Sequence, residues 1–289
     1  MLGELAALGA AVCWAISAVL YKMGITDLDP IQVNLIRSVP ATVFTLLLFW
    51  ALNGWSSNPF AMEPYLLAYI GVGVLLGLGV GDCAYFVSLR KIGVSRAVPL
   101  TSTYPLFMIP ISVILLHEQL VLGVVVGTIG VVVGTWLVST PNRSNNSTTR
   151  DDLKIGVALA LFTAAIWATG FYFFKLALKV VDVFMACATR LLILTPVVAL
   201  LTYTVSPRKR ISRRTYILLS LAGVLALGVG GTLVYYGLKV AAAIVVVPLS
   251  ATTPLFSTVI AATFLKEKVT LKILAGSILI TLGAILISL

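Results

Sequence analysis

The sequence predicts an all-α membrane protein whose ten transmembrane helices form two inverted five-helix repeats. Three observations support this prediction: the composition is too apolar for a water-exposed surface, apolar runs long enough to span a bilayer recur along the chain, and one proline-bracketed phrase occurs twice. Of the 289 residues, 60% are hydrophobic and only 10% are charged, whereas a soluble domain carries about 25% charged residues. With a mean hydropathy of +1.09, the chain is expected to reside in a lipid bilayer.

The apolar runs predict the individual helices. A hydrocarbon core about 30 Å thick requires roughly 20 apolar residues per helix, and these runs are apolar on every face, unlike the alternating strands of a membrane barrel. The predicted spans are 2–23, 30–53, 65–89, 96–116, 120–139, 154–179, 184–205, 214–238, 243–265 and 269–289.

The second half of the chain repeats the first. PLTSTYPLF occupies residues 99–107, and PLSATTPLF occupies residues 248–256. The same alignment matches Trp14 with Trp167, Lys22 with Lys175, Arg37 with Arg190, Gly81 with Gly230, Glu118 with Glu267 and Gly134 with Gly283. We therefore predict a first repeat at 1–139, a polar linker at 140–153 and a second repeat at 154–289. Because five is odd, the second repeat must enter the membrane from the opposite side, an arrangement typical of transporters.

The basic residues predict the orientation. The net charge of +10 could indicate nucleic-acid binding, but most Lys and Arg residues lie in short loops at helix ends. They concentrate on the side that holds residues 90–96, the linker and residues 206–214, and the positive-inside rule assigns this side to the cytoplasm. We expect a multi-pass protein of the plasma (cytoplasmic) membrane with both termini outside the cytoplasm, and no nucleic-acid partner.

The repeated phrase predicts two interrupted helices. Pro105 and Pro254 each lack an N–H group and clash with the carbonyl four residues earlier. In lipid, the freed carbonyls must be satisfied by protein groups, hydroxyls or cavity water. We predict a helix kink at each proline and a central cavity lined by hydroxyl residues that include Thr103 and Thr252. Simple helix-to-helix fitting is the alternative explanation.

Three charged residues lie well inside predicted spans, away from the span ends. An intramembrane carboxylate is costly and by default suggests function, so Asp82 could bind a coupling proton or a cationic group. It could instead be paired with a basic residue or lie near the interface. Arg37 and Arg190 could attract an anionic solute with their guanidinium groups, anchor the helices at the interface, or pair with Asp82. Gly231 occupies the position that matches Asp82, so the two halves differ there.

Aromatic residues cluster near the same helices. Trp14, Tyr85, Tyr104, Trp167 and Tyr235 could stack on a flat or amphipathic solute. Packing between helices and placement at the membrane interface are the alternatives.

Glycines recur in the fifth and tenth spans, where small residues allow close helix contact. They are compatible with packing inside one chain and with a homodimer, so both a monomer and a homodimer remain open. These glycines are Gly123, Gly127, Gly130, Gly134, Gly276 and Gly283.

The sequence lacks the motifs of catalysis. It has no GxxxxGK phosphate cradle, no HExxH and no Cys/His cluster. Its three cysteines, Cys13, Cys83 and Cys187, show no metal-ligand spacing. We expect no enzyme activity, no cofactor and no metal, so solute or proton gradients would have to drive any transport.

In combination, these features resemble the EamA-type carriers of the drug/metabolite transporter superfamily: two inverted repeats, a Trp in helices one and six, an Arg in helices two and seven, the repeated phrase in helices four and nine, and the following Glu. The resemblance covers nearly the whole chain. It implies a secondary carrier that exports or exchanges small organic solutes, such as amino acids and other metabolites, with helices five and ten peripheral. It also implies that the central cavity is lined by Trp14, Arg37, Asp82, Tyr85, Tyr104, Trp167, Arg190 and Tyr235.

The family usually has cytoplasmic termini, whereas the loop charges here favour the reverse, so import and export both remain open. Two other functions are compatible with the sequence. A flippase for lipid-linked solutes would need a lateral opening toward lipid, and a non-transporting scaffold or receptor subunit would have a packed, dry centre.

Overall fold

The computed structural model describes residues 1–25, 28–117, 119, 122–139, 149–206, 211–266 and 269–288, and within these residues all regular structure is helical. The elements are α1 (Leu2–Gly24), α2 (Pro30–Asn53), α3 (Pro64–Val74), η1 (Leu75–Gly81), α4 (Asp82–Ile92), α5 (Val94–Thr101), α6 (Tyr104–Leu115), α7 (Leu122–Ser139), α8 (Arg150–Leu178), α9 (Val183–Val205), α10 (Arg213–Gly223), η2 (Val224–Gly230), α11 (Gly231–Val240), α12 (Ala243–Ser250), α13 (Thr253–Phe264) and α14 (Leu271–Ser288). The all-α prediction is confirmed.

Seven described segments are long and apolar enough to cross a membrane. They are Leu2–Gly24, Pro30–Asn53, Pro64–Ile92, Val94–Leu115, Arg150–Leu178, Val183–Val205 and Arg213–Val240. Large apolar side chains cover the outside of the bundle: Leu122 is 78% exposed, Tyr203 76% and Leu271 82%. Such a surface is suited to lipid and not to water.

Local capping explains where the helices start. Asp29 accepts a hydrogen bond from Ile31 N (2.8 Å), while the Gln32 side chain accepts from Asp29 N (3.2 Å). Together with Pro30 at the first helical position, this capping arrangement starts α2 at the predicted residue.

The start of α8 corrects the predicted linker of residues 140–153. Thr149 accepts from Asp152 N (3.0 Å), and two aspartates occupy the first turn, where negative charge stabilises a helix N-terminus. The helix therefore begins at Arg150, inside the predicted linker. Residues 140–148 lie outside the described residues, as do Glu118 and Glu267.

The repeated phrase interrupts two helices. Residues 102–103 separate α5 from α6, and residues 251–252 separate α12 from α13. Pro105 and Pro254 occupy the second position of the new helices, where a missing N–H costs nothing because that group has no helical acceptor. The chain thus has two short helices in place of each bent one.

Two π-helical segments occupy matching places, η1 with the sequence LLGLGVG and η2 with VLALGVG. A Cβ added at Gly81 would lie 3.1 Å from the indole ring of Trp167, and one added at Gly230 would lie 3.0 Å from that of Trp14. Each π-helix therefore packs its glycine against the tryptophan of the other half. Such widened turns are frequent at functional sites.

At one end of the bundle, lysine side chains connect the ends of several helices by hydrogen bonds and an ion pair. Lys22, near the end of α1, donates to the carbonyl of Leu89 (3.0 Å) near the end of α4. Lys91 of α4 forms an ion pair with Asp152 at the beginning of α8. The end of α1 and the beginning of α8 therefore lie at the same end of the bundle.

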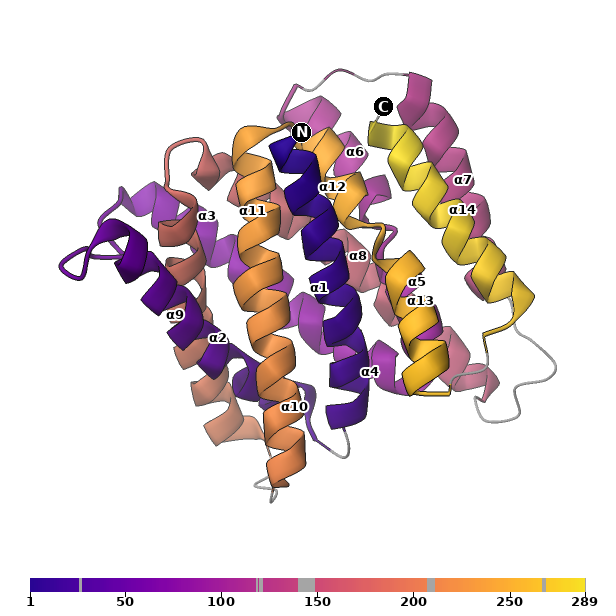
Figure 1. Ribbon diagram of the computed structural model, residues 1–289, viewed down its shortest axis with the longest axis horizontal. Coiled ribbons are helices and arrows are strands. Elements are labelled where there is room, and N and C mark those ends of the chain that lie inside the picture. The colour runs from indigo at the N-terminus through magenta and orange to yellow at the C-terminus, as the bar shows by residue number, and fades with distance from the viewer. Residues whose placement is uncertain are drawn as a thin grey trace.

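The opposite end of the bundle has the complementary arrangement. Lys175, near the end of α8, donates to the carbonyls of Leu238 and Ala241 (both 2.8 Å) at the end of α11. Gly3, at the beginning of α1, lies against Ala241. Helices α1 and α8 therefore run in opposite directions, and Figure 1 shows that α1 begins and α14 ends at the same end of the molecule.

Helices α7 and α14 pack side by side at one edge of the molecule (Figure 1). A Cβ at Gly134 would overlap the carbonyl oxygen of Gly276, and one at Gly283 would overlap that of Gly127. The glycines of these two helices are therefore used for close packing within the chain.

Candidate functional site

A cavity of about 110 Å³ lies at the centre of the bundle, which is room for several water molecules. Its wall combines residues of α1 to α6 and η1 with residues of α8, α9, η2, α11 and α13, so both halves of the chain contribute. No described residue of α7 or α14 lies on the wall. The predicted site residues on the wall are Trp14, Arg37, Asp82, Tyr85, Tyr104, Trp167, Arg190 and Tyr235.

Thr103 and Thr252 are not on the wall. Both are buried, and their hydroxyl groups donate to the carbonyls of Leu100 (2.7 Å) and Leu249 (2.8 Å) in the preceding turn. Their hydroxyls therefore satisfy backbone groups at the helix breaks and do not face the cavity. The hydroxyl residues that do line it include Ser17, Thr101, Ser102 and Thr253.

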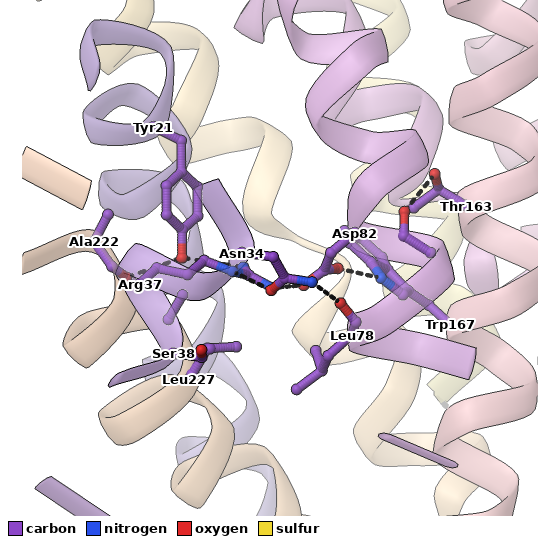
Figure 2. A network of polar contacts seen from close by, with 12 residues as sticks. Tyr21, Asn34, Arg37, Ser38, Leu78, Asp82, Thr163, Trp167, Ala222 and Leu227 are labelled. Atoms are coloured by element: carbon purple, nitrogen blue, oxygen red, sulfur yellow. Dashed lines mark hydrogen bonds and ion pairs between the residues drawn. The ribbon is translucent and has the colours of Figure 1, made fainter. Parts of the chain in front are cut away.

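A buried ion pair joins Arg37 of α2 to Asp82, the first residue of α4 after the π-helical segment. Each side chain is 3% exposed. The second carboxylate oxygen, Oδ1, accepts from Trp167 Nε1 at 2.7 Å. Figure 2 shows these groups in one line across the site. Because a buried charge needs a partner and further hydrogen bonds, this arrangement accounts for Asp82, as in the paired alternative that the sequence left open.

The other two nitrogens of the Arg37 guanidinium each donate one hydrogen bond (Figure 2). Its Nε donates to Asn34 Oδ1 (3.0 Å), and its Nη1 donates to the Tyr21 hydroxyl (3.2 Å). Tyr21 in turn donates to the Ala222 carbonyl (3.2 Å), and Asn34 Nδ2 donates to the Leu78 carbonyl. The sequence analysis did not identify Tyr21 or Asn34, although an Asn one turn before Arg37 inside an apolar run was an available signal.

Arg190, at the matching position in α9, has different surroundings. Its Nη2 donates to the carbonyl of Leu227, and its Cζ lies 4.4 Å from the ring centroid of Tyr235 and 6.0 Å from that of Phe174. Its Nε is buried without an acceptor among the described residues. Within the same residues, no carboxylate lies within ion-pair distance of Arg190.

The difference follows from three matched positions. Where the first half has Tyr21, Asn34 and Asp82, the second half has Phe174, Cys187 and Gly231. A Cβ at Gly231 would overlap the guanidinium of Arg190, so the glycine provides the space that this side chain occupies.

The wall is rich in aromatic side chains and carries an unbalanced charge. Its charged residues are Arg37, Asp82 and Arg190, which leaves one excess positive charge. Aromatic rings supply apolar contact surface beside it. The described residues contain no cluster of potential metal ligands. The arrangement is suited to binding a small molecule.

A bundle that is apolar outside and hollow around buried charges is that of a multi-pass membrane protein that handles a solute. The chain belongs to the EamA-like transporter family, whose family model matches residues 1–140 and 154–289. The resemblance that the sequence motifs predicted is confirmed.

The relatives agree with this assignment. The chain is 28% identical over 287 residues to an uncharacterized transporter of Archaeoglobus fulgidus, and the matched region covers 99% of this chain and 98% of that protein. It is 27% identical over 148 residues to the uncharacterized transporter YvbV of Bacillus subtilis, covering 51% of this chain and 48% of that protein. A solved crystal structure has the same fold, with a TM-score of 0.74, 17% identity, and coverage of 98% of this chain and 95% of that one. The protein is a membrane transporter.

Proposed function

We propose that the protein is a secondary transporter that moves a small organic solute, such as an amino acid or another metabolite, across the plasma membrane by alternating access. The observation that carries this proposal is the central cavity, whose wall is built by matching elements of both halves. A scaffold with a packed centre would have no need of such a space, and sites at the interface of repeats are typical of secondary transporters.

The proposed architecture consists of ten spans in two inverted repeats, at residues 1–139 and 154–289. The seven long apolar segments, together with α7, the α12–α13 pair and α14, supply ten. Matched contacts support the repeat. Lys22 donates to the carbonyl of Leu89, and Lys175 donates to that of Leu238, the matching residue. The two π-helical segments also lie at matching positions. The opposite directions of α1 and α8 support the inversion.

The packing of the first helix of each half supports a rocking motion. Helix α1 packs on α10, η2 and α11, while α8 packs on α3, η1 and α4. Each half thus holds the leading helix of the other. Exchanging the conformations of two such halves would open the cavity to alternate sides of the membrane.

The buried ion pair suggests a coupling step. Protonation of Asp82 would remove the negative charge that holds Arg37 and accepts from Trp167, and would so weaken a contact between α2, α4 and α8. We propose Asp82 as the site through which a proton gradient acts. The loop charges also support termini outside the cytoplasm, which reporter fusions at both ends would test.

Uptake measurements test this function directly. Purified protein in proteoliposomes would be given a mixed metabolite pool, with and without a pH gradient, and the contents analysed by mass spectrometry. We expect at least one small solute to accumulate above the level in empty liposomes, and Asp82→Asn to lose the dependence on the gradient. Lack of any accumulation in either gradient direction would contradict transport, and unchanged pH dependence in Asp82→Asn would remove its coupling role.

A further inference from the structure

Of the two guanidinium groups on the cavity wall, that of Arg190 has no carboxylate within ion-pair distance among the described residues. Arg190 is 2% exposed and lies on the wall. The groups in direct contact with it are uncharged, namely the Leu227 carbonyl and the ring and hydroxyl of Tyr235, and Asp82 acts on it only from beyond ion-pair distance. Its Nε has no acceptor among the described residues. Because a buried charge without a partner is costly, this site favours any ligand that brings a negative charge.

The nearby carboxylate cannot supply that charge. Asp82 is already bonded to Arg37 through one oxygen and to Trp167 through the other. The remaining residues of the wall are uncharged, so the excess positive charge belongs to Arg190.

We infer that Arg190 is the anion-binding subsite of this cavity and that the solute is an amphipathic monocarboxylate. This inference rests on the proposed function, since it takes the cavity as the place where the solute binds. A guanidinium matches a carboxylate with two parallel hydrogen bonds. The aromatic rings of Trp14, Tyr104 and Phe171 on the same wall provide contact surface for an apolar body.

The first half of the chain contains the same kind of ion pair, but there the carboxylate belongs to the chain itself. The guanidinium of Arg37 lies near the rings of Tyr21 and Phe86 and pairs with the carboxylate of Asp82. In the second half, the position that matches Asp82 is a glycine. The solute would thus provide at Arg190 the carboxylate that the chain itself provides at Arg37.

Binding to the purified full-length protein tests this assignment without requiring transport. The probes are acetate, butyrate, hexanoate and benzoate, each compared with its own amide at constant sodium and ionic strength, and the readout is the shift in Tm. We expect at least one carboxylate, and not its amide, to raise the Tm. Arg190→Gln should weaken its binding about 10-fold or more, since a hydrogen bond to a charged group is lost. Arg190→Lys should retain part of it.

A matched pair of variants separates charge from size. Gly231→Asp and Gly231→Asn add side chains of nearly equal bulk, and the added Cβ would meet only the far end of Arg190. Asp would neutralise Arg190 internally and should abolish carboxylate binding, whereas Asn should retain it. The inference is wrong if no carboxylate raises the Tm beyond its amide, if Arg190→Gln binds like the parent, or if Gly231→Asp binds as well as Gly231→Asn. Should the Gly231 variants not fold, the Arg190 pair decides alone.

Uptake into proteoliposomes distinguishes this inference from the proposed function. Carboxylate binding without uptake of any solute would remove the transport cycle and leave the subsite in place. Uptake of neutral solutes only, unaffected by Arg190→Gln, would leave transport in place and overturn the subsite.

Discussion

Arg37 and Arg190 occupy matching positions between matching rings, yet their polar surroundings differ. Arg37 lies 5.4 Å from the Tyr21 ring and 4.7 Å from that of Phe86, and Arg190 lies 6.0 Å from the Phe174 ring and 4.4 Å from that of Tyr235. Of these two arginines, Arg37 alone has a carboxylate within ion-pair distance in the described part of the chain. The comparison shows that the repeat preserves the shape of a site while a few side chains change its charge. A nearly symmetric scaffold therefore encloses an asymmetric cavity.

The ion pair should give the largest difference between the halves. We expect Asp82→Ala to lower the free energy of unfolding by about 3–5 kcal/mol, because Arg37 would be left buried without a counter-ion. Arg190→Gln should cost far less, since that arginine has no carboxylate to lose. Thermal unfolding in detergent micelles measures both.

A double variant provides the control for this first prediction. Arg37→Met combined with Asp82→Leu should recover a large part of the loss, because an apolar pair leaves no isolated charge. If Asp82→Ala and Arg190→Gln lowered the free energy of unfolding equally, the ion pair of Arg37 would not contribute more to stability than the contacts of Arg190.

Substituting alanine for either of two matching glycines between α7 and α14 should lower the free energy of unfolding by the same amount. Gly134→Ala and Gly283→Ala each place a Cβ on a backbone oxygen of the facing helix, and we expect a loss of about 1–3 kcal/mol for each. Since neither helix lines the cavity, ligand binding by the folded fraction should be unchanged. Clearly unequal losses would argue that this contact does not follow the repeat.

The contacts of the π-helical segments with tryptophan offer a smaller test of the same equivalence. Gly81→Ala and Gly230→Ala require Trp167 and Trp14 to yield by a few tenths of an ångström, which we expect to cost about 1 kcal/mol in each case. Tryptophan fluorescence should change in both variants. A fluorescence change in only one variant would show that the two glycine–tryptophan contacts also differ between the halves.

The smallest effect is expected where α2 meets α9. The hydroxyls of Thr42 and Thr195, at matching positions, lie 2.8 Å apart. Thr42→Val and Thr195→Val should each cost about 0.6 kcal/mol, a typical value for hydrogen bonds between membrane helices. Because one bond is shared, the double variant should lose little more than either single one. Fully additive losses would show that the two hydroxyls act separately.

Much of the fold could be predicted because hydropathy along the chain reports lipid exposure directly. The predicted span 30–53 coincides with α2, and the phrase that contains Pro105 and Pro254 marked two helix interruptions. The π-helical segments were not predicted, since glycine-rich apolar stretches such as residues 71–81 are equally compatible with a regular helix.

Eight residues that the sequence singled out lie on the cavity wall, but Tyr21 and Asn34 were missed and most contacts among these residues were not predicted. Matching of the halves identified Trp14 and Trp167 together, but only the structure shows that Trp14 donates to the Ala226 carbonyl (3.1 Å) while Trp167 donates to Asp82. The sequence also gave no reason to exclude Thr103, whose hydroxyl donates to the Leu100 carbonyl of the preceding helix α5.

By itself, the sequence determined that this chain is an apolar, helical membrane protein with matching residues in its two halves, because composition, run length and matched residues are properties of the chain alone. Only the tertiary structure decided how the charges are distributed. Asp82 could have paired with either arginine, and hydropathy is the same in both cases. The packing of α2 against α4 brings Arg37 to Asp82, and Trp167 of α8 donates to the same carboxylate. This contact across long sequence separations leaves Arg190 without a carboxylate among the described residues.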